Sequence, residues 1–199
     1  MSESTTAPPR RVAPFVAGAV AVVLAVLFGV LLVVEPSSDT AETVLLDRAA
    51  PAAEGEFDDG TVFELSRRRG SWVVLNFFTS TCIPCRNEHP ELIEFVDQQR
   101  SLGVNGAEFY TIVQNDDPAD VAAFFEEFGG DWPVVFDVDY SFQNGFGVAQ
   151  VPETWIIDPN GIVRGRVISE VSAEFLSTSI QNLRERLCCL LYTSDAADE

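Results

Sequence analysis

Residues 72–85 read WVVLNFFTSTCIPC, an apolar run, interrupted only by Asn76, that is followed by two cysteines with two residues between them. Such a run predicts a strand that is buried on both faces, as in a parallel sheet. The residues after Cys82 have helical spacing, which places this cysteine at a strand-to-helix junction. Positive partial charge and free N–H groups at a helix N-terminus favour a thiolate. The stretch therefore predicts that Cys82 is an exposed nucleophile and that Cys85, one turn into the helix, is the resolving thiol.

Two other interpretations of the cysteine pair are weaker. The only further cysteines are the adjacent Cys188 and Cys189, and the only histidine is His89, so no spacing in the chain suits a zinc site and no metal is expected. A purely structural disulfide is also disfavoured, because closing so short a loop constrains the unfolded chain very little. The pattern favours redox chemistry.

Residues 12–34 are uncharged, almost wholly apolar and long enough to cross a hydrocarbon core as one helix. Arginines precede the stretch and acidic residues follow it, which predicts that residues 1–11 are cytoplasmic and that the rest of the chain lies outside the cell membrane. A cleaved signal peptide is the alternative, but its apolar region would be shorter and would end at a small-residue cleavage site. Residues 35–56, rich in Ser, Ala, Pro and Glu, are expected to form a tether.

The chain has 31 acidic residues against 12 basic ones, all of them arginine, for a net charge of −19. An acidic surface of this kind argues against nucleic acid and anionic lipid as ligands.

The C-terminal stretch, residues 189–199, matches a translation of the common transposase sequencing adaptor. We therefore interpret it as an artefact, exclude it from the fold and give Cys189 no function.

The remaining pattern is that of an α/β fold. Short apolar segments predict strands, and amphipathic segments with capping signals predict helices. Pro90 should kink the first helix. The resulting order predicts a central mixed β-sheet flanked by helices. The predicted strands are 61–65, 72–79, 109–113, 133–136, 153–157 and 162–168; the predicted helices are 83–101, 118–128 and 172–187, with a helical turn at 142–146.

Two stretches, residues 73–92 and 147–161, resemble thioredoxin-like proteins. Within that fold, Glu-His-Pro after the cysteine pair and Val-Pro-Glu-Thr at 151–154 are similar to the membrane-anchored TlpA/ResA/CcmG (DsbE) group. The resemblance covers a thioredoxin-like domain at 57–187. It implies an extracytoplasmic thiol-disulfide oxidoreductase of the bacterial cell membrane, of a group that often serves cytochrome c maturation.

The resemblance also implies a substrate-binding segment at Val151, Pro152 and Glu153. It predicts that Val151-Pro152 is a cis peptide beside the cysteine pair, which would leave the Val151 backbone free to pair with a substrate strand. An ordinary trans proline at the start of a strand is the alternative. Glu153 is a second acidic candidate for proton handling.

Glu88 stands three residues after Cys85, so a helix places the two on one face. Burial and a nearby thiolate would raise the pKa of this carboxyl and make it a proton donor or acceptor for Cys85. The alternative is a solvent-facing glutamate, as Glu91 and Glu94 are expected to be. Asn76 stands where thioredoxins carry a buried aspartate, which shifts proton handling toward Glu88. His89 is expected to be a packing or hydrogen-bonding residue.

The leading functional hypothesis is a disulfide reductase that needs no cofactor. The resemblance implies oxidised apocytochrome c as the substrate and a membrane thiol-electron transporter of the DsbD/CcdA kind as the electron donor. One alternative is a thiol peroxidase, because Thr79 and Cys82 also resemble part of the peroxiredoxin motif, although position 75 is Leu where that motif has proline. The other is a noncatalytic binding or chaperone module that uses the groove around Pro152.

Overall fold

The computed structural model describes residues 20, 23–24 and 43–195. The chain divides into two units, Met1–Ser38 and Asp39–Glu199. The predicted anchor at 12–34 lies almost entirely outside the described residues, and so do residues 196–199. Among the residues that are described, none of the helices is both long and apolar enough to cross a membrane.

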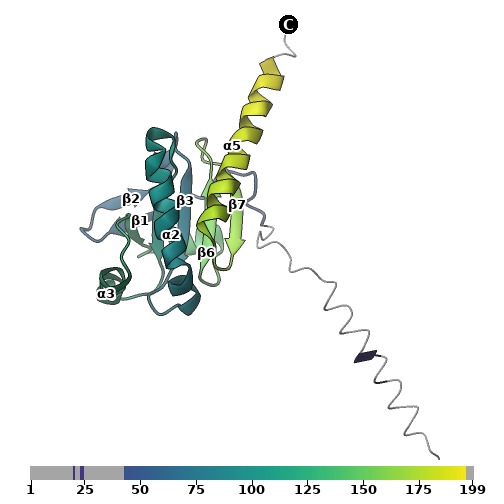
Figure 1. The fold of residues 1–199 in the computed structure, drawn as a ribbon. Helices are drawn as coiled ribbons and strands as arrows, with labels where there is room; N and C mark the ends of the chain where they lie inside the picture. The colour runs from purple at the N-terminus through teal and green to yellow at the C-terminus, as the bar shows by residue number, and fades with distance from the viewer. Residues whose placement is uncertain (1–19, 21–22, 25–42, 196–199) are drawn as a thin grey trace, which may run out of the picture. The chain divides into compact units, whose positions relative to one another are not determined.

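A seven-stranded mixed sheet forms the centre of the second unit, with strand order β2-β1-β5-β4-β3-β6-β7 (Figure 1). Strands β3, β4 and β5 are parallel, whereas β6 runs antiparallel to β3, β7 to β6, and β1 to both β2 and β5. The strands are β1 (Glu54–Phe57), β2 (Val62–Glu64), β3 (Val73–Phe78), β4 (Glu108–Val113), β5 (Val134–Phe136), β6 (Glu153–Ile157) and β7 (Val163–Ile168).

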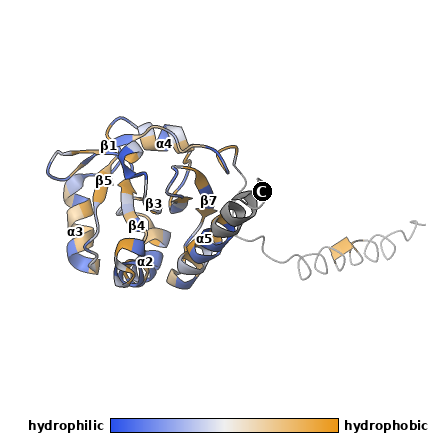
Figure 2. Ribbon diagram, turned by 90° about the horizontal axis from the view of Figure 1, so that it is seen from above, coloured by the Kyte–Doolittle hydropathy of each residue, from blue (hydrophilic) through white to orange (hydrophobic). Residues whose placement is uncertain are grey.

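Helices cover both faces of the sheet, which confirms the predicted α/β architecture. Seen from above, α2, α3 and α5 lie on one side of the strands and α4 on the other (Figure 2). The helices are α2 (Ile83–Ser101), α3 (Pro118–Phe128), α4 (Ser141–Phe146) and α5 (Ala173–Asp195), with short 3-10 turns at Leu65–Arg68 and Gly103–Asn105.

Strand β3 lies at the centre of the core, and every one of its side chains is buried. Val73, Leu75 and Phe77 pack into the cluster on the α4 side, while Val74 packs among side chains of α2 and α5. Because alternate residues of a strand face opposite sides, the burial of both faces explains why the run carries no polar alternation. Asn76 is the one polar residue in β3, and it is completely buried.

Several boundaries differ from the sequence predictions. Strand β1 begins inside the stretch 35–56 that was expected to be a tether, and its residues Glu56 and Phe57 pair with β5 and extend the sheet. The last helix begins as predicted, with Ser172 Oγ accepting a hydrogen bond from Phe175 N at 3.2 Å, but it continues beyond Leu187 to Asp195. Pro90 lies within α2, which runs on through it; the predicted kink stays a prediction.

Candidate redox active site

Cys82 and Cys85 form a disulfide at the N-terminus of α2, with their Cα atoms 5.2 Å apart. Cys82 is the N-cap residue, and its sulfur accepts a hydrogen bond from Cys85 N at 3.1 Å. Its side chain is half-buried, whereas Cys85 is only 1% exposed. A substrate disulfide can thus approach the Cys82 sulfur from solvent. The Cys85 sulfur is accessible only to Cys82 unless the surrounding structure opens.

The turn between β3 and Cys82 is held by an aspartate from another element. The Asp116 carboxylate, in the connection between β4 and α3, accepts hydrogen bonds from Ser80 N at 2.5 Å and Ser80 Oγ at 3.1 Å. Nothing in the local pattern predicts the contact, because the two residues are 36 positions apart and are joined by the parallel pairing of β3 with β4.

The peptide bond between Val151 and Pro152 is cis, as the resemblance predicts. Val151 packs against an apolar group that we call the redox cluster. Its backbone N–H and C=O make no hydrogen bond with any described residue, so both are available to an extended segment of another chain. The redox cluster consists of Phe78, Cys85, Val113, Val121 and Phe124, with Cys82 among the residues packed against it.

Glu88 is a buried carboxylate one turn below Cys85, and its side chain is 2% exposed. Its Oε1 accepts a hydrogen bond from Asn76 Nδ2 at 2.8 Å, and its Oε2 accepts one from Val171 N at 3.0 Å. Burial raises the pKa of this group to about 7, although the two hydrogen bonds oppose the rise because they favour the ionised form. Glu88 therefore titrates near neutral pH, where a proton carrier is most effective.

Asn76 links Glu88 to the central sheet. Besides its bond to Glu88, Nδ2 donates to Thr154 Oγ1 on β6 at 3.1 Å. The amide oxygen of Asn76 is buried without a hydrogen-bond partner among the described residues. Asn76, which stands where thioredoxins carry a buried aspartate, is therefore bonded directly to the Glu88 carboxylate.

Glu153 lies on the other face of the sheet. Residue pairing places Asn76 opposite Thr154 and Phe77 opposite Glu153, so the period-2 alternation of β6 turns Glu153 toward the α4 side. There it is fully buried, and it accepts hydrogen bonds from Arg166 Nε at 2.9 Å, Arg166 Nη2 at 3.1 Å and Trp155 Nε1 at 2.7 Å. Glu153 follows Pro152 in the sequence, but it therefore lies on the opposite face of the sheet from Glu88.

Two neighbours of Glu88 have structural roles. His89 Nε2 donates to Gly129 O at 2.9 Å, its ring packs against Phe124 and Trp132, and burial lowers its pKa, which agrees with the predicted packing role. Glu91 was expected to face solvent, and this is wrong: its Oε2 accepts a hydrogen bond from Ala173 N at 2.9 Å and so caps the first turn of α5.

Comparison with known proteins agrees with this geometry. Residues 46–166 match the AhpC/TSA family. The chain is 30% identical to the thiol:disulfide interchange protein HelX of Rhodobacter capsulatus, over 71% of this chain and 78% of that protein. It is 29% identical to the thiol-disulfide oxidoreductase ResA of Bacillus subtilis, over 67% of this chain and 73% of that protein.

A solved structure from Chlorobium tepidum, described as a putative thiol:disulfide interchange protein DsbE, superposes with a TM-score of 0.59 at 26% identity. The match covers 67% of this chain and 94% of that one. The half-exposed Cys82 over a buried Cys85, the cis proline and these relatives lead to one assignment. The chain belongs to the AhpC/TSA family and, within this thioredoxin-like family, to the TlpA/ResA/CcmG group of thiol-disulfide oxidoreductases.

Proposed function

We propose that this chain reduces disulfides of extracytoplasmic proteins, with Cys82 as the nucleophile, Cys85 as the resolving thiol and Glu88 as the proton carrier. The observation that carries the proposal is the order of exposure along one helix end. A half-buried sulfur caps the helix, a buried sulfur lies behind it, and a buried carboxylate lies one turn further in. This order suits an attack from outside followed by resolution from within.

The reduced protein begins the cycle. The Cys82 thiolate attacks one sulfur of the substrate disulfide; that bond breaks, a bond between Cys82 and the substrate forms, and the released substrate sulfur takes up a proton from solvent. Cys85 then loses its proton and attacks the Cys82 sulfur. The mixed disulfide breaks, the second substrate thiol leaves, and the Cys82–Cys85 disulfide seen in the structure remains. Two electrons pass from the cysteine pair to the substrate.

Glu88 serves the second step. With a pKa of about 7 it is partly ionised at neutral pH and can accept the proton that Cys85 must lose. The same group, once protonated, can return the proton when the pair is reduced again. Glu153 has no part in this scheme, because it lies on the other face of the sheet with both oxygens bonded to Arg166.

The setting of the reaction is proposed from the sequence. An uncleaved helix at 12–34 would anchor the chain in the bacterial cell membrane and hold the catalytic domain on the extracytoplasmic side. The proposed substrate is the oxidised haem-attachment cysteine pair of apocytochrome c, which must be reduced before thioether bonds form. Electrons would come from a membrane thiol transporter of the DsbD/CcdA kind. The names of the relatives, HelX, ResA and DsbE, support the thiol-exchange chemistry.

A pair of assays tests the function. Insulin reduction with dithiothreitol and consumption of hydrogen peroxide are measured side by side for the wild type, Cys82→Ser and Cys85→Ser. We expect insulin turnover in the wild type, its loss in both variants, and little peroxide consumption. Peroxide consumption that outpaces insulin reduction and needs only Cys82 would identify a thiol peroxidase instead. Insulin turnover no faster in the wild type than in Cys82→Ser would indicate a noncatalytic binding module.

The order of attack and the substrate are tested by trapping. The Cys85→Ser variant cannot resolve a mixed disulfide, so it should accumulate a covalent adduct with an oxidised peptide that carries the haem-attachment cysteine pair. Mass spectrometry locates the adduct. An adduct that forms on Cys85 in the Cys82→Ser variant, and none on Cys82 in Cys85→Ser, would reverse the assigned roles.

A further inference from the structure

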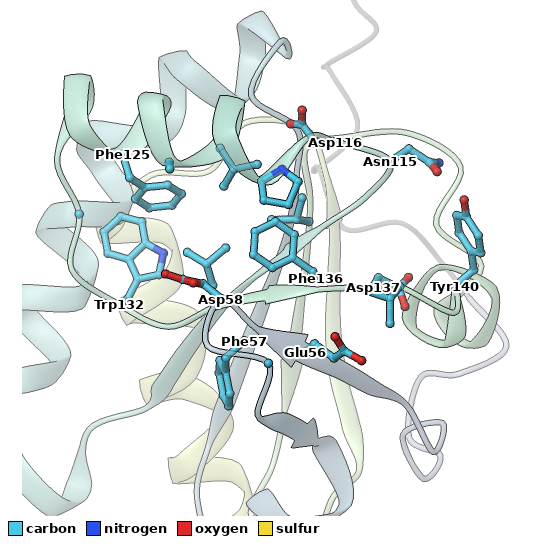
Figure 3. A pocket seen from close by; sticks show the side chains of 18 residues that line it. Glu56, Phe57, Asp58, Asn115, Asp116, Phe125, Trp132, Phe136, Asp137 and Tyr140 are labelled. Carbon is cyan, nitrogen blue, oxygen red and sulfur yellow. The ribbon is translucent and has the colours of Figure 1, made fainter.

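A cavity of about 810 Å³ opens beside the redox site, between α3, β5 and the turn that follows β1 (Figure 3). Its volume falls in the range of sites that hold drug-sized ligands. The rim is exposed, but the apolar residues of the wall are buried or half-buried, so an apolar group that enters would be desolvated on several sides. The apolar residues that matter here are Val113, Val121, Phe125, Trp132, Val134 and Phe136.

Four carboxylates surround this cavity, Glu56, Asp58, Asp116 and Asp137, and among the described residues no lysine, arginine or histidine lines it. Within the part of the chain that the structure describes, none of the four forms a salt bridge. Asp116 is bonded to Ser80, and Asp137 accepts the N–H groups at the start of α4. Glu56 and Asp58 are exposed, and Glu56 pairs with Phe136 in the sheet, so its side chain projects on the cavity side.

The cavity adjoins the redox site through shared residues. Val113 and Val121 belong both to its wall and to the redox cluster against which Cys82 and Val151 pack. Its rim residue Asp116 is hydrogen-bonded to Ser80, only two residues before Cys82. Two residues span at most about 7 Å, so an extended segment bound at Cys82 reaches the rim within a few residues.

We infer that this cavity docks the protein substrate: it takes an apolar side chain, aromatic ones best, from a segment near the reacting cysteine, with lysine or arginine beside it. The inference rests on the proposed function and specifies its substrate class. An aromatic ring supplies the large apolar area that such a wall can bury. Cations beside the ring face the exposed carboxylates of Glu56 and Asp58, whereas an acidic segment would meet like charges there and the net charge of −19.

The test uses the full chain in detergent micelles, reduced beforehand, and three peptides that each contain an intramolecular disulfide. Near the cysteines the peptides carry Trp-Lys-Lys, Trp-Glu-Glu or Ala-Lys-Lys. A small neutral disulfide, 2-hydroxyethyl disulfide, reports the chemistry alone. We expect the first peptide to react at least about tenfold faster than the third, which is the scale of burying one large apolar side chain. Its advantage over the second peptide should shrink as salt is added, because exposed charges are screened.

The variant Ala122→Trp fills the cavity, since Ala122 lines it on α3. Its neighbour Ala123, which is exposed and outside the lining, supplies the matched control Ala123→Trp. Ala122→Trp should abolish the preference for the Trp-Lys-Lys peptide while the rate with the small disulfide stays unchanged. The double variant Glu56→Gln/Asp58→Asn should shrink the distinction between lysine and glutamate but keep that between tryptophan and alanine.

The outcomes separate the docking site from the enzyme function. Equal rates for the three peptides, or an unchanged preference in Ala122→Trp, would overturn the docking site. Reduction of the small disulfide in the same experiments would still support the proposed enzyme function. Loss of preference in Ala123→Trp as well would also overturn it, because the effect would then not arise in the cavity. Failure to reduce the small disulfide would instead reject the proposed function itself.

Discussion

The Asn76 Nδ2 atom donates a 2.8 Å hydrogen bond to Glu88 Oε1, joining the central strand β3 to the helix that carries the cysteine pair. The bond lies in the interior, because both side chains are almost completely buried. A buried donor of this kind favours the ionised carboxylate and partly offsets the burial that raises its pKa to about 7. The position of Asn76 therefore helps to set the pH at which Glu88 can exchange a proton.

The first prediction concerns the pH dependence of disulfide reduction. The rate of wild-type reduction should change with an apparent pKa near 7 that is missing in Glu88→Gln, because an amide cannot exchange the proton. The two thiols and the carboxyl titrate as a coupled set, so the comparison concerns apparent values. Glu94→Gln is the control, since Glu94 is exposed on the same helix. Superimposable curves for the wild type and Glu88→Gln would show that Glu88 carries no proton.

The second prediction concerns stability. The pKa of Glu88 is raised from 4.5 in the unfolded chain to about 7 in the folded protein, so the folded state binds more protons in that interval. The contribution of Glu88 to the free energy of unfolding is therefore fully present below about pH 4.5 and is lost as the pH rises through 7. The loss amounts to at most about 3 kcal/mol, at 1.36 kcal/mol per pKa unit. Urea unfolding of the oxidised protein at a series of pH values measures it.

The Glu88→Gln variant supplies the comparison. It should lack this pH-dependent decline but be less stable at low pH by about 1–3 kcal/mol, because the glutamine amide must leave one of its partners unsatisfied. If the stability of Glu88→Gln declined between pH 5 and 8 by as much as that of the wild type, the decline would have to come from other groups.

The third prediction concerns Asn76. Asn76→Ala removes the hydrogen bond that favours the ionised carboxylate, so the pKa of Glu88 should rise above 7 and the pH–rate profile should move to higher pH. Thr154→Val is the matched control, because it removes the other partner of the Asn76 amide without touching Glu88. A profile that stays in place in Asn76→Ala, or moves equally in Thr154→Val, contradicts the direct effect.

The fourth prediction concerns the turn before Cys82. Asp116→Ala removes both hydrogen bonds to Ser80 and leaves a partly buried N–H without its partner, which should lower the free energy of unfolding by about 1–3 kcal/mol. The turn should also hold Cys82 less firmly, so the rate of insulin reduction should fall. Glu126→Ala, on the exposed side of α3, should change neither quantity by a comparable amount. Wild-type values in Asp116→Ala would show that Ser80 needs no such support.

The sequence alone determined the parts of this site that depend on neighbours within a few residues. An apolar run that ends in Cys-Ile-Pro-Cys specifies a buried strand, a helix start and a pair of sulfurs within bonding reach, because these follow from backbone periodicity and helix-end electrostatics. The three-residue spacing from Cys85 likewise places Glu88 one turn further along α2. Family resemblance added the cis peptide at Val151-Pro152, which no local pattern requires.

Only the tertiary structure decided what surrounds these groups. The partners of Glu88 are Asn76, 12 residues before it, and Val171, 83 residues after it, and the support of Ser80 is Asp116, 36 residues away. The face on which Glu153 lies depends on its register with β3. Such contacts depend on which strands pair and on how α5 packs against α2, and a local pattern in the sequence carries no information about either. The placement of the cysteine pair is therefore local in origin, whereas the pKa of Glu88 is a property of the assembled fold.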